Sequence, residues 1–265
     1  MFGEQDKVKK GRFVCTTSWD DGSVHDLRLA DMLVKYGVPA TFYIARKSEY
    51  RGLSDNQIRQ LGTSFEIGAH TLNHVSLDEA SDDVAYTEIG GSKTWVEQIS
   101  GRPCKMFCFP RGKFRASQLS IVRNAGFTGV RTVELLSLSS PRVVRGVAVM
   151  GTTVQAFNHN FFGYVKNGLR RWAGGNLWRY VKHGCGNDWV HTAKSLLLYA
   201  SANGGVFHLW GHSWEIEETG QWQALEQTLA AISEYMQSAS LLTNMELCSD
   251  VGKAEDDPRP ALVSR

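Results

Sequence analysis

Apolar runs alternate with segments of helical periodicity along most of the chain. The first run, Phe13 to Thr17, is rich in aromatic and β-branched residues and ends just before Asp20-Asp21-Gly22. Apolar positions then recur at helical spacing from Leu27 to Tyr36, until Gly37-Val38-Pro39 ends the pattern. This order predicts a first β-strand followed by a helix.

The same alternation continues to about residue 150 and returns after residue 188. We predict further strands over residues 40–45, 65–69, 106–109, 128–133, 144–150, 206–210 and 241–247. We predict further helices over residues 54–61, 84–99, 116–125, 189–202 and 221–236. Sustained alternation of this kind is typical of an α/β fold, a mainly parallel sheet or barrel with functional loops at the carboxyl ends of its strands.

Two segments depart from this regular pattern. Residues 156–187 are rich in Asn, Gly, Phe and Trp without clean periodicity, which predicts an irregular insertion. Residues 250–265 carry charges and two prolines, and we expect them to form a mobile tail. Since 42% of the residues are apolar, we expect one domain over residues 1–265, with a core over about 12–248.

The composition indicates which kinds of partner and which cellular compartment to expect for this protein. A net charge of +2 with 21% charged residues argues against a nucleic-acid partner, although Lys166 to Arg171 form a local basic cluster. No stretch approaches the roughly 20 apolar residues of a membrane span, and the first residues lack an apolar signal core, so we expect a cytoplasmic protein. The five cysteines do not indicate a disulfide framework, and Cys104 and Cys108 are interpreted as buried thiols. The sequence does not predict an oligomeric state.

Two polar motifs lie where predicted strands end. Asp20 and Asp21 follow the first strand, and His70 and His74 form a His-x-x-x-His pair after the third. Two imidazoles and one carboxylate leave a coordination position open on a divalent metal, and the second carboxylate is free to act as a base. Neighbouring side chains on an extended segment point apart, which fits one ligand and one base. The pattern predicts a metal-dependent hydrolase, with zinc favoured and cobalt, nickel or iron(II) as alternatives.

His208 and His212 form a second His-x-x-x-His pair. On an extended strand these residues lie about 13 Å apart at ~3.3 Å per residue, too far to share one metal ion. His212 comes where the strand gives way to a loop, and we prefer it as the general acid. His208 is then a buried, hydrogen-bonded residue or one that orients a neighbour.

Taken together, these motifs resemble a known family. Thr-x-x-Asp-Asp-Gly at 17–22, His-Thr-x-x-His at 70–74, the strand end at Pro110-Arg111-Gly112 and a late strand closing on His212 are similar to the NodB-homology polysaccharide deacetylases, carbohydrate esterase family 4. The resemblance spans about residues 13–215. It implies a distorted (β/α) barrel with mainly parallel strands, and removal of N- or O-acetyl groups from sugars.

The resemblance also implies roles for individual residues. Asp21, His70 and His74 would bind the metal, Asp20 would be the general base and His212 the general acid. The backbone N–H of Arg111 could stabilise the oxyanion, while its guanidinium could bind a substrate carboxylate or phosphate. The candidate substrate contacts, which for the two tryptophans have core packing as their alternative, are Trp210, Trp214, His208 and Asp188.

The chain departs from the family pattern at two places. Family members often have Arg two residues before the motif proline and Tyr just after it, where this chain has Cys108 and Arg111. The Asp-x-x-Asp-Trp element that helps to orient the acid is not clear, and Asp188-Trp189 is its candidate. These departures concern the substrate and the acid rather than the metal ligands.

The function predicted from the sequence is removal of an N-acetyl group from a sugar or glycan. The absence of a signal segment favours an intermediate of bacterial surface-polysaccharide synthesis as the substrate. One alternative is an amidohydrolase of the same fold that acts on a small non-sugar amide. The other is a catalytically silent glycan-binding module, which would have an aromatic groove but no need for Asp20.

Overall fold

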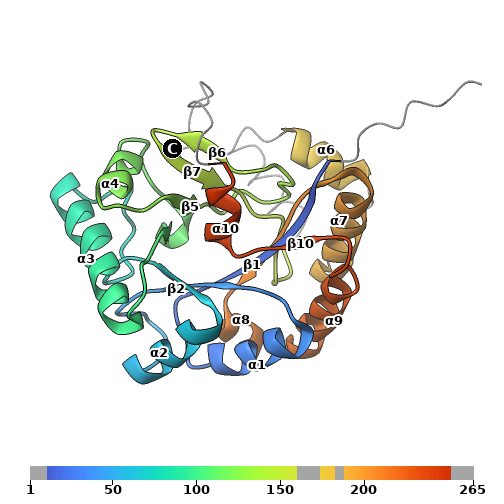
Figure 1. Cartoon of the computed structure of the whole chain (residues 1–265), viewed down its shortest axis with the longest axis horizontal. Coiled ribbons are helices and arrows are strands. Elements are labelled where there is room, and N and C mark those ends of the chain that lie inside the picture. Colours follow the sequence, from blue (N-terminus) through green and yellow to red (C-terminus); the bar gives the residue numbers. More distant parts are fainter. Residues whose placement is uncertain (1–10, 160–173, 183–187, 252–265) are drawn as a thin grey trace, which may run out of the picture.

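A curved sheet surrounded by helices forms the body of the molecule (Figure 1). The structure is a computed structural model that describes residues 11–159, 174–182 and 188–251. The basic cluster 166–171, Cys185 and most of the predicted tail lie outside these residues. Among the described helices, none is both long and apolar enough to cross a membrane.

The elements follow the predicted alternation of strands and helices over most of the chain. The strands are β1 (Phe13–Asp20), β2 (Thr41–Ile44), β3 (Glu66–Ala69), β4 (Met106–Cys108), β5 (Gly129–Arg131), β6 (Arg142–Val144), β7 (Val147–Met150), β8 (Val154–Gln155), β9 (Gly205–Gly211) and β10 (Ser240–Leu241). The helices are α1 (Asp26–Tyr36), α2 (Asp55–Ser64), α3 (Asp82–Ser100), the 3₁₀ turn η1 (Pro110–Gly112), α4 (Gln118–Asn124), α6 (Gly174–Lys182), α7 (Trp189–Asn203), α8 (Ser213–Glu218), α9 (Trp222–Ser233) and α10 (Asn244–Ser249).

The sheet is mostly parallel and centres on β1. Its strand order is β6-β7-β5-β4-β3-β2-β1-β9-β8, and β10 pairs with the first half of β1. The described pairings are parallel except β6 with β7, which form an antiparallel hairpin. This curled, mixed half-barrel agrees with the distorted (β/α) barrel expected from the sequence. The parallel order brings the carboxyl ends of β1, β3, β4, β5 and β9 to the same end of the sheet.

Alternate residues of each strand face two different cores. Phe42 of β2 and Phe107 of β4 pack into the large core that includes the helices, whereas Tyr43 and Cys108 belong to a smaller core on the opposite face of the sheet. This is the period-two alternation expected of strands that are buried on both faces. Two neighbouring residues of one strand can therefore both be buried, one in each core.

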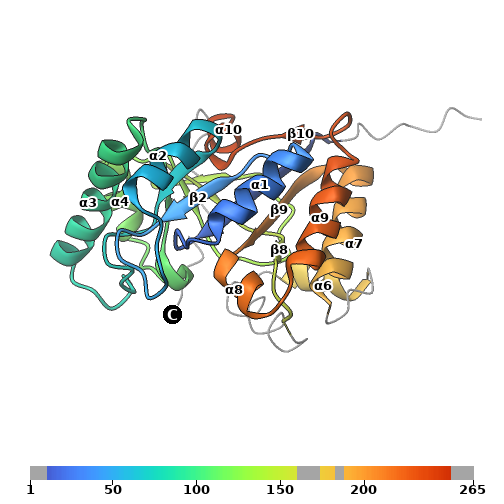
Figure 2. The same ribbon diagram turned by 90° about the horizontal axis from the view of Figure 1, so that it is seen from below.

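Helix α10 covers the amino-terminal end of the sheet. The backbone N–H of Asn244 donates to Thr41 Oγ1 and that of Met245 donates to Glu66 Oε2, at 3.0 and 3.1 Å. Figure 2 shows α10 and α8 at opposite ends of the molecule. The end of the sheet where the parallel strands finish lies beside α8 and is not covered by α10, so we look for a functional site there.

The predicted strand over residues 241–247 is wrong. Only Ser240–Leu241 is extended, and a helix follows because Thr243 and Glu246 form a reciprocal capping box. The apolar residues of this segment are spaced along one helical face, where Leu247 and Cys248 are buried. A short apolar segment does not by itself distinguish a strand from a helix.

The region between residues 144 and 188 also differs from the prediction. The single strand predicted over 144–150 is a hairpin, because Arg145 and Gly146 turn the chain with φ of 51° and 75°. The irregular insertion 156–187 contains α6, and its residues 160–173 and 183–187 lie outside the described part of the chain. Helix α8 was not predicted.

Candidate active site

A cavity of about 410 Å³ lies among the loops that follow the parallel strands. Its walls include eight of the ten residues singled out in the sequence, namely Asp20, Asp21, His70, His74, Arg111, Trp210, His212 and Trp214. The remaining wall contains Glu49, Tyr50, Gly112, Val133, Leu135, Gln155, His159 and Glu215. The structure thus brings together motifs that are up to 194 positions apart in the chain, from 20 to 214.

Asp21, His70 and His74 form a compact group in this cavity. The Oδ1 atom of Asp21 lies 3.1 Å from His74 Nε2 and 3.6 Å from His70 Nε2. Although it is buried, this oxygen accepts no well-aligned hydrogen bond from the described residues. His70 Nδ1 donates to the carbonyl of Cys108 at 2.8 Å, so the lone pair of the neutral ring is on Nε2, which faces Asp21. Two imidazole nitrogens and the unpartnered carboxylate oxygen make three ligand atoms that fit a divalent metal ion.

Asp21 is held by a neighbour from another part of the chain. Trp214 Nε1 donates to Asp21 Oδ2 at 2.8 Å, which leaves Oδ1 directed at the histidines. Burial acts to raise the pKa of Asp21, but the nearby His74, His70 and His212 side chains outweigh it and hold that pKa well below its usual range. Burial is also the main cause that lowers the pKa of His70. Both groups are therefore in the forms that bind metals, carboxylate and neutral imidazole.

The loop that carries the two histidines is fixed by Glu88 of α3. This buried carboxylate accepts the backbone N–H groups of Leu72 and Asn73, each at 2.9 Å, and the side-chain amide of Asn73 at 2.6 Å. The loop includes two non-glycine residues at positive φ, Thr71 at 66° and His74 at 53°. Such backbone conformations persist only where the surroundings hold them, and Glu88 supplies that support.

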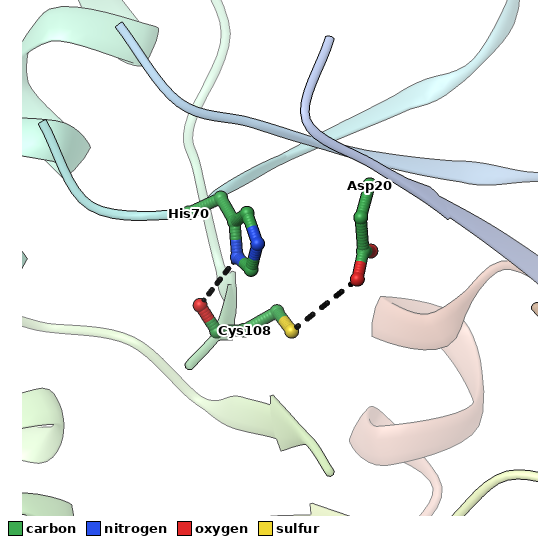
Figure 3. Close-up of side chains that lie close together, drawn as sticks. All are labelled: Asp20, His70 and Cys108. Atoms are coloured by element: carbon green, nitrogen blue, oxygen red, sulfur yellow. Dashed lines mark hydrogen bonds between the residues drawn. The ribbon is translucent and has the colours of Figure 1, made fainter. Parts of the chain in front are cut away.

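A second group of possible metal ligands lies next to the first. Asp20, His70 and Cys108 come close together from β1, β3 and β4 (Figure 3). However, His70 Nδ1 is occupied by the Cys108 carbonyl, and burial raises the pKa of the Cys108 thiol well above its usual value. A thiol that stays protonated is a poor metal ligand, so the Asp21 group fits an ion better.

Asp20 is paired with an arginine that the sequence analysis did not single out. Asp20 Oδ1 accepts a hydrogen bond from Arg131 Nη2, and Oδ2 lies 4.0 Å from Cys108 Sγ. Arg131 is fully buried between the rings of Trp210 and Tyr43, with its guanidinium carbon 4.7 and 5.2 Å from their centroids. The sequence could have indicated this pair, because Arg131 is the one charged residue in the predicted strand 128–133 and a buried arginine requires an anionic partner.

His212 is oriented by Glu215, three residues further along the chain. His212 Nδ1 donates to Glu215 Oε2 at 2.7 Å, and His212 Nε2 lies 4.0 Å from Asp21 Oδ2. Glu215 Oε2 also accepts from Gln155 Nε2 at 3.0 Å, and His159 Nε2 donates to Gln155 Oε1 at 2.8 Å. Burial acts to lower the pKa of His212, but Glu215, Asp20 and Asp21 outweigh it and raise that pKa. His212 therefore keeps its proton to higher pH than a free imidazole.

The mouth of the cavity combines aromatic and charged side chains. Tyr50 and Trp214 stack with ring centroids 3.8 Å apart. Arg111 sits at φ 57° in η1, and its exposed guanidinium lies 3.7 Å from Glu49 Oε1. The backbone N–H of Arg111 has no partner among the described residues, so it remains available to a ligand in the cavity.

Two of the predicted site residues lie outside the cavity. His208 is buried, accepts from Ser18 Oγ on Nε2 at 2.8 Å and donates from Nδ1 to the Gly151 carbonyl at 3.1 Å. Burial lowers the pKa of His208 to about 3, so it is a neutral structural residue. Asp188 caps α7 by accepting from the N–H of Val190 at 2.9 Å. The carboxylate expected from Asp188 beside the acid is instead provided by Glu215.

Residues 7–130, which include the first half of the cavity's residues, match the family model described as polysaccharide deacetylase. This matched part, just under half of the chain, is similar to the polysaccharide deacetylase family. Comparison with curated proteins gives no match.

Solved structures of polysaccharide deacetylases share the fold. A putative polysaccharide deacetylase from Mycobacterium smegmatis is 16% identical with a TM-score of 0.66, and the match covers 94% of each chain. The Xyl-CE4 domain of a multidomain xylanase from the hindgut metagenome of Trinervitermes trinervoides is 16% identical with a TM-score of 0.58, covering 93% of this chain and 95% of that one. At these identities the likeness concerns the fold.

The same fold also occurs in a polysaccharide deacetylase relative without activity. A CE4 family pseudoenzyme from Bacillus anthracis is 14% identical with a TM-score of 0.57, and the match covers 89% of this chain and 66% of that one. Likeness to this family therefore does not decide activity, which depends on the residues that this chain has in its cavity.

Proposed function

We propose that this protein is a metal-dependent hydrolase of the polysaccharide deacetylase family that removes the N-acetyl group of a sugar or glycan. The observation that carries the proposal is the unpartnered Asp21 Oδ1, which faces the Nε2 atoms of His70 and His74 inside the cavity. Asp20 and His212 lie beside this group, each with a fixed charged partner. A catalytically silent module would not need either pair.

Asp21, His70 and His74 are the residues that would hold the ion. A divalent metal held by these residues would act as a Lewis acid on the acetyl carbonyl and would lower the pKa of a water molecule bound to it. Two imidazoles and one carboxylate favour zinc, and cobalt, nickel and iron(II) accept the same ligands. The hydrogen bonds from Trp214 to Asp21 and from His70 to Cys108 orient two of the three ligands.

The residues around this group can supply the proton transfers of amide hydrolysis. Asp20 takes a proton from the attacking water, because Oδ1 is held by Arg131 whereas Oδ2 has only the 4.0 Å contact with Cys108 Sγ. The N–H of Arg111 donates to the oxygen that becomes negative when water adds to the carbonyl. His212, protonated and held by Glu215, gives a proton to the leaving nitrogen when the C–N bond breaks. Acetate and an amine are the products.

The cavity wall supports a sugar as the substrate. Tyr50 and Trp214 present aromatic surface at the mouth, and Val133 and Leu135 add apolar surface deeper in the wall. Aromatic faces pack against the C–H groups of sugars, whereas the charged rim of Glu49 and Arg111 can hydrogen bond to hydroxyl groups. A surface-polysaccharide intermediate as the natural substrate and a cytoplasmic site of action stay predictions.

Acetate release measures the proposed reaction directly. The zinc-loaded protein is incubated with N-acetylglucosamine oligomers, an O-acetylated sugar and small amides such as acetamide, alongside Asp20→Asn. We expect acetate from the N-acetylated oligomers, and a loss of about 10²-fold or more in Asp20→Asn with its metal retained. Release from the small amides alone would favour the non-sugar amidohydrolase. No release from any substrate would favour the silent glycan-binding module.

A further inference from the structure

We propose that Arg131 is the positioning residue for the base, holding the Asp20 carboxylate of β1 from β5, four places away in the strand order. This inference rests on the proposed function, because it deepens the role given there to Asp20. It concerns a residue that does not line the cavity and that lies 111 positions from its partner in the chain. Strand register, burial and the partners of the guanidinium support this role.

Strand register explains why this arginine reaches the interior. In β5, Val130 packs into the large core, so Arg131 points to the opposite face of the sheet. Cys108 of β4 is the register partner of Arg131, and the two side chains therefore leave the sheet at the same level. Both reach the carboxylate of Asp20, one by Nη2 and the other by Sγ.

Arg131 forms a buried ion pair with Asp20. The side chain is fully buried, and Asp20 is its one carboxylate partner among the described residues. Its Nε and Nη1 atoms have no hydrogen-bond partner among those residues. A buried guanidinium without an anion is strongly unfavourable, so removal of either Arg131 or Asp20 leaves an unpaired buried charge that destabilises the fold. Asp20 in turn outweighs the effect of burial and raises the pKa of Arg131.

Two aromatic rings fix the plane of the guanidinium. Trp210 of β9 and Tyr43 of β2 lie 4.7 and 5.2 Å from its carbon. The Tyr43 hydroxyl accepts from Asn244 Nδ2 at 2.9 Å, which ties this ring to α10. A planar fork held between rings has little freedom, so the hydrogen bond to Asp20 has a defined direction. The carboxylate is thereby turned with Oδ1 toward Arg131 and with Oδ2 4.0 Å from Cys108 Sγ, its weaker partner.

This arrangement has a specific consequence for the reaction. A base is effective only when its free oxygen is within reach of the proton it takes, and a carboxylate that can rotate spends time in unproductive orientations. Arg131 touches neither the cavity nor a ligand in it, so its loss should lower kcat much more than it changes KM. A purely structural role would not produce that split.

Because Cys108 and Arg131 are register partners, the guanidinium can be moved from position 131 to position 108 by substitution. Cys108 has a small side chain, and Arg131 fills the space beside it on the inner face. In Arg131→Met, an arginine introduced by Cys108→Arg would start one strand away at the same level of the sheet. If the role of Arg131 is to bring a guanidinium to Asp20, the double variant should regain activity.

The kinetic test uses the zinc-loaded full chain and an N-acetylated oligomer. We expect Arg131→Met to lower kcat by about 100-fold with KM within about threefold and with its metal retained. Cys108→Arg/Arg131→Met should recover at least about tenfold of that loss. Arg115→Met is the matched control, because Arg115 pairs with Asp82 and the carbonyls of Asp78 and Ala80, away from the cavity. A kcat within threefold of wild type in Arg131→Met would overturn the proposal.

A second measurement does not depend on activity or on the stability of one variant. Melting temperatures of wild type, Asp20→Asn, Arg131→Met and the double variant form a cycle. We expect Arg131→Met to lower the melting temperature by several degrees, and by less than half as much when Asp20 is already Asn, because no buried carboxylate is then left unpaired. Equal effects in both backgrounds would overturn the pairing. Arg131→Lys serves if Arg131→Met does not fold, with a loss of at least about tenfold in kcat expected.

These outcomes separate the two proposals. A wild-type protein that releases no acetate contradicts the proposed function, while the melting cycle still decides whether Arg131 is committed to Asp20. Wild-type activity that is insensitive to Arg131→Met contradicts the positioning role and leaves the proposed function in place.

Discussion

The Nδ1 atom of His212 donates a 2.7 Å hydrogen bond to the carboxylate of Glu215, one turn further along at the start of α8. This contact leaves Nε2 as the nitrogen directed toward the Asp21 group, 4.0 Å from Asp21 Oδ2. The orientation of the proposed acid is therefore set by a residue of the same short helix.

Replacement of Glu215 by Gln should shift the pH dependence of turnover. Glu215 contributes to the raised pKa of His212, so its loss lowers that pKa and His212 loses its proton at lower pH. We expect the alkaline limb of the kcat profile to move to lower pH, with kcat at its maximum reduced by about 10-fold or more. The measurement is kcat from pH 5 to 10 for both proteins. An alkaline limb that stays in place would show that His212 is not the acid.

Removal of the Glu88 carboxylate should weaken metal binding without touching a ligand. Glu88→Ala frees the N–H groups of Leu72 and Asn73, so the loop between His70 and His74 loses its support. We expect the metal affinity to fall by about 10- to 100-fold, as is typical for residues that orient ligands. Competition with a chromogenic chelator measures this directly.

The matched control for this variant is Glu226→Ala. Glu226 is a surface carboxylate that pairs with Lys35 and Tyr36, away from the cavity. Its metal affinity should equal that of wild type. Equal affinity in Glu88→Ala would mean that the loop holds its shape without the carboxylate.

Glu66 should make the stability of the fold depend on pH. Burial raises the pKa of Glu66 to about 7, whereas its unfolded value is 4.5. Between these values the folded state binds more protons than the unfolded state, so this group makes stability fall as pH rises from 4.5 to 7 and then level off. The glutamine of Glu66→Gln cannot ionise, so the stability of this variant does not have this fall between pH 4.5 and 7.

The melting temperature of Glu66→Gln relative to wild type should therefore increase between pH 5 and pH 8. Differential scanning calorimetry at several pH values gives the comparison. A difference that does not change with pH would mean that the carboxyl beneath α10 does not titrate in this range.

The metal ligands and the base were accessible from sequence because each lies at the end of a strand or in the loop that follows one. Asp20 and Asp21 come at the end of β1 and His70 at the end of β3, so a parallel arrangement of strands is enough to gather them. No knowledge of strand order was needed. The same reasoning placed Arg111 and His212 at strand ends, and both line the cavity.

The charged partners were not accessible in the same way. Arg131 on β5 meets Asp20 on β1 although the two strands are four places apart in the sheet, and its register aligns Arg131 with Cys108. A strand pattern does not specify such a register between distant segments. Glu215 followed His212 in the sequence, but its role required a helix beginning at Ser213, which the strand pattern of 206–210 did not predict. Asp188 was singled out instead, and it caps α7.

The metal content of the purified protein tests the central claim most directly. Protein prepared without chelator, incubated with zinc and desalted, is analysed by inductively coupled plasma mass spectrometry together with His74→Ala. We predict about one equivalent of metal in the wild type and loss of that metal in His74→Ala, because His74 Nε2 is 3.1 Å from the unpartnered oxygen of Asp21. Metal absent from both proteins, or equal in both, would contradict the site.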